Sequence, residues 1–459
     1  MQIVSPQFLL FAAVTLAVYY LLARKAQNAW LLAASYFFLA TLSWQYALAL
    51  LAVTLVNFFI GRKVASRLWL ALGLTLDLAG FLALKFLSGP YGPRLLGHAD
   101  LLSILLPIGF SFYILQAISY LLDVHRGQTQ PARTFADFAL YLAYFPKLLA
   151  GPIERPARFL SALEADRRVS NVDLARSAGL LLVGILRKVI IADRINALIP
   201  PTVFSDPASF TSLDKLVWLL VFVFGLYNDF HGYTTLMRGL SGLFGIELTA
   251  NFRQPFFATS FSDFWTRWHI SLSFWLRDYI FFPARRWLVQ KRWPRWIAII
   301  TPPLLTMLAS GYWHGAYVSM LTWGSIHGLF LVGEQILRGK RPTEENQIRH
   351  ALSILFTFSM TTLALAVFAS SSLRAATGYL SGLFAFTGGS ASLLPFIDLL
   401  PAALVSFWLD WQENRHGSDA FFLQWKPSAQ AWGFALALWL LLLYLGPQAG
   451  TVTFVYQGF

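Results

Sequence analysis

The sequence predicts an all-α protein that crosses a membrane many times. Hydrophobic residues make up 57% of its 459 residues and charged residues only 12%, which is about half the charged fraction of soluble domains. The hydrophobic residues gather in long runs, and about 20 mainly apolar residues suffice to span a bilayer as a helix. A soluble protein of this size would need more polar surface to cover its core. We therefore expect a polytopic protein with about 11 to 13 transmembrane helices.

The expected spans follow one another along the chain. They are 5–23, 29–43, 45–61, 68–87, 101–122, 174–198, 214–237, 297–312, 316–337, 350–371 and 430–446. Residues 376–408 are apolar but broken by glycines and prolines, and they are expected to hold one or two further spans. No soluble module interrupts the series. Residues 1–459 are therefore expected to form a single membrane-embedded domain, with its catalytic core at about 101–337.

The net charge of +13 is concentrated in short loops. Examples are Arg24 with Lys25, Arg62 with Lys63, and the basic run at 285–295. Cytoplasmic loops collect Lys and Arg in this way, so the charge indicates topology and contact with anionic lipid headgroups and not binding to nucleic acid. The first basic pair follows the first apolar run. That run is therefore expected to be an uncleaved helix and not a signal peptide.

Two regions lack the pattern of a simple span. Residues 135–160 are apolar but contain three prolines and Lys147, and residues 252–284 mix aromatic side chains with five charged ones. Charges are costly on a lipid-facing helix, and irregular backbone is tolerated at membrane depth only inside protein or beside water. The first region is expected to be either a re-entrant segment or an amphipathic helix lying flat on the cytoplasmic face. For the second, a re-entrant segment beside an internal cavity is favoured.

The residue types present leave histidine as the expected catalytic side chain. The chain has no cysteine, which excludes disulfides, thiolate metal sites and a cysteine nucleophile. No histidine pair has the i, i+4 spacing and acidic neighbour of a helix-borne zinc site, so no metal is expected. There is no glycine-rich phosphate loop and no nucleophile elbow. What remains is general-base catalysis, in which a histidine takes a proton from a hydroxyl whose oxygen attacks an activated carbonyl such as a thioester.

His314 and His269 are the leading candidates for this role. His314 stands in "GYWHGA", near the junction of two apolar helices. His269 stands in "FWTRWHISLSFW". If that stretch is one helix, Trp265, His269 and Ser273 share a face that is mainly aromatic and hydroxyl-bearing.

The other histidines have plausible structural roles. His327 lies in the middle of an expected span, and helical periodicity places its ring far from that of His314, so a hydrogen bond to a neighbouring helix competes with a chemical role. His231 follows Asn228 and Asp229 at an expected helix end or break. The remaining histidines lie in polar loops, where solvation is expected. They are His98, His125, His350 and His416.

Four stretches resemble the membrane-bound O-acyltransferase family, in its bacterial alginate O-acetylation and D-alanyl transfer branch. They are "YLAYFPKLLAGPIERPARFL" (141–160), "YNDFHGYTTLMRGLSGLFGIELTANFRQPF" (227–256), "SFSDFWTRWHISLSFWLRDYIFFP" (260–283) and "SGYWHGAYVSMLTWGSIHG" (310–328). The aromatic chain end "FVYQGF" is also similar to this branch. The resemblance implies a ring of transmembrane helices, with re-entrant helices around a central funnel or tunnel.

The resemblance also implies residue roles. His314 matches the invariant catalytic histidine, which would take the hydroxyl proton. His269 matches the second essential position, which would orient the acceptor or hold the carbonyl oxygen as it gains charge. The sequence leaves open which of the two does which task. Supporting or substrate-binding roles are expected for their neighbours in these stretches, namely Asn228, Asp229, His231, Arg267, Trp313 and His327.

One stretch departs from the branch. Members that acetylate exopolysaccharides usually have "DFSGYSD", where this chain has "DFHGYTT". His231 therefore replaces a serine and Thr235 replaces an aspartate. The change is compatible with a different acceptor and with neutral drift.

The leading hypothesis is transfer of an acyl group, expected to be acetyl, toward an extracytoplasmic polysaccharide. The donor would be a cytoplasmic thioester, either acetyl-coenzyme A or an acyl carrier, with no cofactor bound permanently. The family likeness implies an exported acetyltransferase partner for the last step, and a location in the bacterial inner membrane. D-alanyl transfer from a carrier protein to teichoic acid is the alternative within the family. A proton-coupled transporter or an export scaffold is the alternative of another class, although no inverted repeat is visible.

Overall fold

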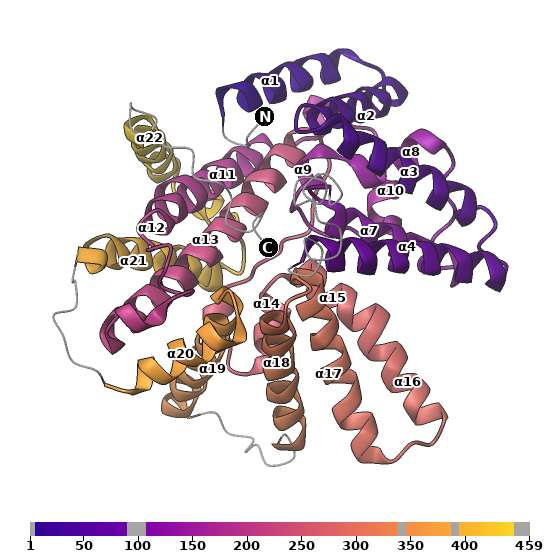
Figure 1. Ribbon diagram of the computed structural model, residues 1–459. Coiled ribbons are helices and arrows are strands. Elements are labelled where there is room, and N and C mark those ends of the chain that lie inside the picture. The colour runs from indigo at the N-terminus through magenta and orange to yellow at the C-terminus, as the bar shows by residue number, and fades with distance from the viewer. Residues whose placement is uncertain (1–4, 90–106, 338–345, 387–393, 445–459) are drawn as a thin grey trace. The chain divides into compact units, whose positions relative to one another are not determined.

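A computed structural model describes residues 5–89, 107–337, 346–386 and 394–444. Helices account for all regular secondary structure in these ranges, which confirms the all-α prediction (Figure 1). Three described helices are long and apolar enough to cross a membrane, namely Trp44–Gly61, Arg67–Ser88 and Gln347–Ala369, and Pro6–Leu21 is a shorter apolar helix. The end of the expected span 430–446 and the chain end "FVYQGF" lie outside the described residues.

The helices form two compact units. The first comprises Met1–Leu181 with Thr234–Thr249, and the second comprises Leu182–Tyr233 with Ala250–Phe459. Two helices contribute residues to both units: α11 (Leu174–Ile185) and α13 (Ser212–Leu243).

The first unit consists mainly of the N-terminal helices. They are α1 (Pro6–Leu21), α2 (Arg24–Ala40), α3 (Trp44–Gly61), α4 (Arg67–Ser88), α7 (Phe110–His125), α8 (Phe135–Ala143), α9 (Phe145–Leu148), α10 (Pro156–Glu164) and the 3-10 turn η1 (Val169–Asn171). Short polar residues begin several of them. The Ser5 side chain accepts the Phe8 N–H ahead of α1, and Thr134 accepts the Asp137 N–H ahead of α8, as N-caps do.

The irregular region 135–160 belongs to the interior of the first unit. It is divided into α8, α9 and α10, and every residue from 138 to 154 is buried. Lys147 donates hydrogen bonds to the side chain of Gln116 and to the backbone oxygen of Tyr141. A helix lying flat on a membrane surface would leave one face uncovered. The continuous burial therefore favours the re-entrant alternative over the surface helix.

The second unit contains the remaining elements. They are the π-helix η2 (Leu186–Asp193), α12 (Arg194–Asn196), η3 (Pro207–Ser209), η4 (Pro255–Phe257), α14 (Phe261–Arg267), α15 (Ile270–Leu276), the π-helix η5 (Arg277–Phe281), α16 (Phe282–Gln290), α17 (Arg295–His314), α18 (Val318–Leu337), α19 (Gln347–Ala369), α20 (Leu373–Phe384), α21 (Leu394–His416), η7 (Phe421–Gln424) and α22 (Pro427–Tyr444). The expected span 174–198 is thus interrupted by a π-helix, a feature found frequently at functional sites.

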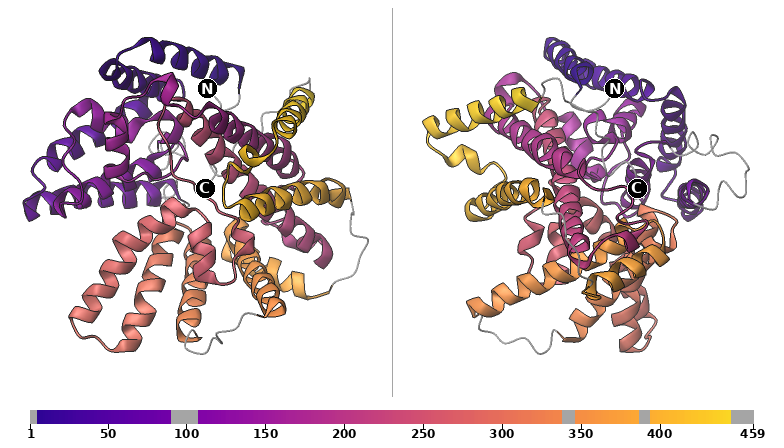
Figure 2. Two further views of the ribbon diagram at one scale, coloured as in Figure 1. Left: turned by 180° about the vertical axis from the view of Figure 1, so that it is seen from behind. Right: turned by 60° about the vertical axis from the view of Figure 1, so that its left-hand side comes forward.

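Helices α17 and α18 form the tightest hairpin of the second unit. They are joined by a short turn and lie side by side in Figure 1 and in the left view of Figure 2. Glycines make this approach possible, because a Cβ at Gly311 would lie 2.3 Å from the Met320 carbonyl oxygen, and one at Gly324 would lie 2.2 Å from that of Met307. Small residues at helix contacts are typical of membrane helices. This packing positions the histidines of both helices.

Replacing Gly324 by alanine should therefore destabilise the hairpin. The new Cβ would contact backbone and could not be relieved by a rotamer change, and overpacking costs about 1–3 kcal/mol. We expect Gly324→Ala to lower the midpoint of thermal unfolding, measured by fluorescence-detected size exclusion in detergent. Gly333→Ala on the same helix is the matched control, because a Cβ there meets no atom within 4 Å. Equal midpoints for the two variants would contradict the close contact.

Candidate active site

His269 lies in a backbone turn between α14 and α15. Its φ angle is 43°, in the left-handed region, which is uncommon for a residue other than glycine. The turn is held by Asn251, whose backbone oxygen accepts the Ile270 N–H (2.9 Å) and whose side-chain oxygen accepts the Ser271 N–H (3.2 Å). Strained backbone of this kind persists where surrounding contacts impose it and clusters at functional sites.

The turn corrects one sequence-based expectation. Trp265, His269 and Ser273 do not share one helix face, because α14 ends at Arg267 and α15 begins at Ile270. Long-range hydrogen bonds replace the helical ones at this point, since the Arg253 N–H also donates to the Arg267 backbone oxygen (2.9 Å).

Arg267 has a supporting position in α14. Its Nε lies 2.7 Å from Oδ1 of Asp263, one helical turn earlier, and both side chains are about one quarter exposed. Asp263 also accepts the Thr259 N–H (3.0 Å), and Ser260 caps the helix start. The Arg267 pair therefore stabilises α14 locally, and no described contact joins it to a histidine.

The His269 ring is enclosed by aromatic side chains. It is 1% exposed, and its ring centroid lies 4.8 Å from that of Phe230 and 5.6 Å from that of Trp313. Burial lowers the pKa of His269 to about 3. The ring is therefore neutral near physiological pH, with one nitrogen able to donate a hydrogen bond and the other able to accept one.

His314 is the last residue of α17 and lies next to the same tryptophan. Its ring centroid is 4.8 Å from that of Trp313, 5.3 Å from that of Trp323 on α18 and 5.0 Å from that of Phe368 on α19. The residue is 7% exposed. Because Trp313 contacts both rings, it connects the two leading candidates, which lie 45 residues apart in sequence.

His327 continues this series of rings. Its centroid lies 5.0 Å from that of Trp323 and 5.1 Å from that of Trp265. The expectation that His327 and His314 lie far apart around a helix is wrong, because the two residues belong to different helices of the α17–α18 hairpin and both contact Trp323. The structure thus brings His269, His314 and His327 together through two tryptophans.

Asn228, Asp229 and His231 occupy a different position from the one expected. They lie in the middle of α13, which runs without interruption from Ser212 to Leu243. Hence His231 is at neither a helix end nor a break. The polar side chains are tolerated there because buried partners satisfy them: Asn228 donates to the Phe224 backbone oxygen (2.9 Å) and to Ser406 Oγ (3.0 Å).

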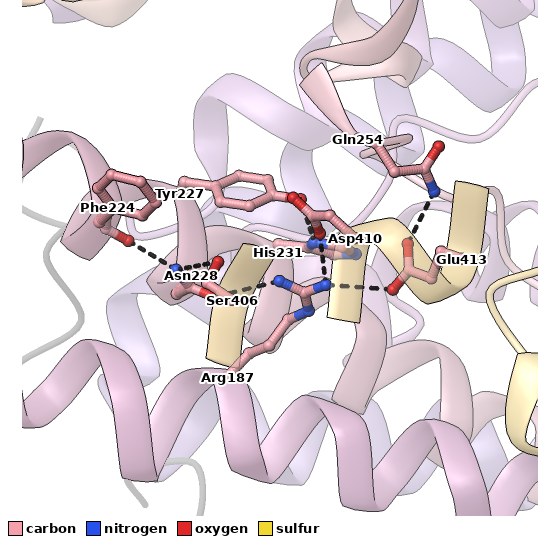
Figure 3. A network of polar contacts seen from close by, with 9 residues as sticks. All are labelled: Arg187, Phe224, Tyr227, Asn228, His231, Gln254, Ser406, Asp410 and Glu413. Carbon is pink, nitrogen blue, oxygen red and sulfur yellow. Dashed lines mark hydrogen bonds and ion pairs between the residues drawn. The ribbon is translucent and has the colours of Figure 1, made fainter. Parts of the chain in front are cut away.

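A buried charge cluster surrounds these residues (Figure 3). Its centre is Arg187 of the π-helix η2, which is fully buried. One of its terminal nitrogens lies 2.6 Å from Asp410 and 3.2 Å from Glu413, both on α21, and the other donates to the Asn228 side-chain oxygen (3.2 Å). The Tyr227 hydroxyl lies 2.8 and 3.0 Å from the two Asp410 oxygens.

The cluster reaches the His269 turn from one side. The His231 Nδ1 lies 3.1 Å from the Tyr227 hydroxyl, and Trp268, which precedes His269, contacts both Tyr227 (6.1 Å between centroids) and Phe252 (5.1 Å). Asp229 has a different partner in η2, the Nζ of Lys188 at 2.7 Å. Through Tyr227 and Trp268, these contacts connect the α13 residues with the turn that contains His269.

Most residues of this cluster are not predicted from the sequence. Arg187 and Lys188 lie inside an expected span, where an ionisable residue signals a functional or paired site. That signal was available, but the partners Asp410 and Glu413 lie more than two hundred residues away in sequence. Within the described part of the chain, no group of three or more histidine and acidic side chains could hold a metal ion.

A cavity of about 740 Å³ adjoins the histidine helices. Three arginine side chains contribute to its lining, namely Arg277, Arg285 and Arg295, together with four aromatic side chains, namely Trp265, Phe274, Phe281 and Trp293. Trp265 belongs both to the cavity wall and to the aromatic surroundings of His327. The cavity therefore combines cationic and aromatic side chains close to the candidate site.

Comparisons with known proteins found one matching family model and several similar proteins. Residues 133–373 match the model of the membrane-bound O-acyltransferase family. The chain is 35% identical to a probable alginate O-acetylase of Pseudomonas fluorescens, over 84% of this chain and 76% of that protein. It is 28% identical to a peptidoglycan O-acetyltransferase of Helicobacter pylori, over 84% and 80% of the two chains. It is 28% identical to a teichoic acid D-alanyltransferase of Streptococcus thermophilus, over 60% and 70%.

The charge cluster predicts that replacing Arg187 alone destabilises the protein more than replacing Arg187 together with its two acidic partners. Arg187→Met would leave two carboxyl groups buried without their cation, and breaking a buried ion pair costs about 3–5 kcal/mol. We expect a large loss of folded protein in detergent, measured by size exclusion and thermal unfolding. The triple variant Arg187→Met, Asp410→Asn, Glu413→Gln should recover part of that loss.

The control is an exposed ion pair. Arg168 lies 2.9 Å from Asp166 with both side chains more than half exposed, and exposed pairs contribute about 0–1 kcal/mol. Arg168→Met should leave the unfolding midpoint nearly unchanged. A similarly small effect for Arg187→Met would show that the cluster does not hold the unit together.

Proposed function

Because this chain belongs to the membrane-bound O-acyltransferase family, we propose that it transfers an acetyl group from a thioester toward a hydroxyl of an extracytoplasmic polysaccharide. The chain is an acyltransferase and a membrane protein. The observation that carries the finer proposal is that the rings of His269 and His314 both contact the Trp313 ring. It is supported by the polysaccharide acetylation named for two of the similar proteins.

His314 is proposed as the general base. It takes the proton of the acceptor hydroxyl, whose oxygen then attacks the thioester carbonyl carbon and pushes the carbonyl electrons onto oxygen. Collapse of this intermediate breaks the carbon–sulfur bond. The thiolate recovers the proton from the His314 imidazolium, so that the products are an ester and a free thiol. Proton transfer of this kind contributes about 100- to 10,000-fold to the rate.

His269 is proposed to stabilise the oxyanion of the intermediate. Its neutral ring can donate a hydrogen bond, and its left-handed turn fixes the direction of that ring. Donors that are positioned before the reaction are effective because little reorganisation is needed when charge develops. A buried, aromatic environment strengthens the interaction further, since water is excluded.

The donor is proposed to enter through the arginine-lined cavity. Coenzyme A and carrier-bound pantetheine are both phosphate esters, and arginine forms strong, geometrically specific contacts with phosphate. Arg285 and Arg295 would attract the phosphate, while the reactive end would extend toward the histidines. Acetyl-coenzyme A or an acyl carrier protein is therefore the proposed donor, with no permanently bound cofactor.

The acceptor lies on the other side of the membrane in this proposal. The protein would reside in a bacterial inner membrane, and an exported acetyltransferase would carry out the final transfer to the polysaccharide. The alternative within the family is D-alanyl transfer, and the likeness to a teichoic acid D-alanyltransferase supports testing it.

The decisive test is turnover of labelled donors by protein in liposomes. Wild type is expected to release the acetyl group of radiolabelled acetyl-coenzyme A or transfer it to added partner and polysaccharide. His314→Ala should reduce kcat by about 100- to 10,000-fold, and His269→Ala by about 100- to 1,000-fold. His350→Ala, which alters an exposed residue of α19, is the matched control and should retain activity.

Each outcome of this test has a definite meaning. Turnover of a D-alanyl carrier thioester in place of acetyl donors would favour the alternative acyl group. Consumption of neither donor would overturn the enzyme proposal for these substrates. An active His314→Ala protein would overturn the assignment of the base.

The cavity makes a separate prediction. Arg285→Glu and Arg295→Glu should each raise KM for acetyl-coenzyme A by about 10-fold or more, because each removes a charged hydrogen-bond donor to phosphate. Arg286→Glu is the matched control, since Arg286 is exposed beside Arg285 but does not line the cavity. Equal effects of all three variants would indicate that the basic surface attracts the donor by long-range electrostatics, and that the cavity holds no specific phosphate site.

A further inference from the structure

Three nitrogen-bearing rings form a compact cluster between the cavity and His314. They are Trp265 of α14 and Trp323 and His327 of α18. Their ring centroids lie 5.9 Å (Trp265–Trp323), 5.1 Å (Trp265–His327) and 5.0 Å (Trp323–His327) apart, and all three pairs meet edge to face. Each ring therefore contacts the other two.

Each ring has a buried nitrogen that lacks a hydrogen-bond partner among the described residues. These atoms are Nε1 of Trp265, Nε1 of Trp323 and Nδ1 of His327. Trp323 is 3% exposed and His327 is 2% exposed. Leaving a buried donor or acceptor unsatisfied costs about 1–3 kcal/mol, and Trp and His side chains normally find partners when buried. Three such atoms in one cluster point to a ligand with complementary polar groups.

The cluster lies along the way from the donor cavity to the proposed base. Trp265 lines the 740 Å³ cavity at one end of the cluster, and Trp323 contacts the His314 ring at the other end (5.3 Å). Close packing of α17 and α18 at Gly324, the residue after Trp323, holds this second contact in place. The three rings thus form a continuous series of contacts from the cavity wall to the His314 ring.

We propose that Trp265, Trp323 and His327 bind the arm of the donor by hydrogen bonds to its carbonyl oxygens. An indole N–H can only donate, so the ligand atoms facing Trp265 and Trp323 must be acceptors. A pantetheine arm carries two amide carbonyls in addition to the thioester carbonyl, whereas a plain alkyl thioester carries the thioester carbonyl alone. The cluster therefore selects an amide-bearing arm and holds it in register with His314.

This inference rests on the proposed function, because it names the part of the donor that the same site binds. It gives His327 a binding role, in place of the structural hydrogen bond that its position in an apolar helix suggests. No covalent step is assigned to the cluster.

The test compares two donors in wild type, Trp265→Phe, Trp323→Phe and His327→Phe proteins. One donor is S-acetyl pantetheine, and the other is the acetyl thioester of an alkanethiol without amides. Each variant keeps an aromatic ring but loses the nitrogen. We expect KM for S-acetyl pantetheine to rise about 3- to 10-fold per variant, with kcat changed less than about 2-fold and the alkanethiol donor unaffected. Trp432→Phe, at an exposed tryptophan of α22, is the matched control.

A binding measurement separates failure of this inference from failure of the enzyme proposal. The dissociation constant of a ketone analogue of S-acetyl pantetheine, in which a methylene group replaces the sulfur, can be measured without turnover. If wild type turns over the thioester but the variants bind the analogue equally well, the inference is wrong and the function stands. If wild type neither turns over the thioester nor binds the analogue, both are wrong.

Structural damage gives a different pattern. A ring that only packs would, when replaced, change kcat for both donors and lower the unfolding midpoint, and this result would overturn the inference. Trp265 is only partly buried, so Trp265→Phe is the variant expected to keep its fold if Trp323→Phe does not. An unchanged KM in a folded Trp265→Phe protein would therefore decide against the proposal.

Discussion

The second compact unit depends on the buried ion pairs that the Arg187 guanidinium forms with Asp410 and Glu413. Removing a charged group from water costs several kcal/mol unless partners compensate, and here Asp410 and Glu413 on a distant helix supply the compensation. Gln254 donates to Glu413 (2.9 Å) and so ties the loop before α14 to the same cluster. The α13 side chains complete it (Figure 3). A polar interior of this kind specifies one arrangement of helices, because a different arrangement would leave charges unpaired.

Contacts between aromatic rings connect this buried cluster with the histidines. Trp268 packs on the cluster through Tyr227, and the next residue is His269 in its left-handed turn. Trp313 and Trp323 then separate and connect the three histidines. Buried among such rings, His269 remains neutral at physiological pH. A neutral imidazole can donate a hydrogen bond from one ring nitrogen, and this is the role proposed for His269 at the oxyanion.

Cationic and aromatic side chains line the proposed donor cavity together. Arg285 of α16 and Arg295 at the start of α17 belong to its wall, as do Trp265 of α14 and Phe274 of α15. The guanidinium of Arg277 lies over the Phe274 ring, 4.2 Å from its centroid. A phosphate ester of a long amphipathic arm fits such a lining, because arginine binds phosphate and the aromatic rings offer apolar contact to the arm.

Composition by itself determined that the chain is an all-α membrane protein, and its motifs indicated His269 and His314 as the leading candidates for a functional role. Both conclusions follow from the cost of placing polar groups in apolar surroundings, which makes a rare histidine in a long hydrophobic run informative. Tertiary structure decided the rest. The helix around His269 is broken because Asn251 supplies hydrogen bonds from outside it. His314 and His327 both contact Trp323 because glycines let two helices touch. The carboxylates that pair with Arg187 lie on α21, a helix more than two hundred residues away in sequence. Such contacts join residues far apart in sequence, and no local pattern of residues encodes them.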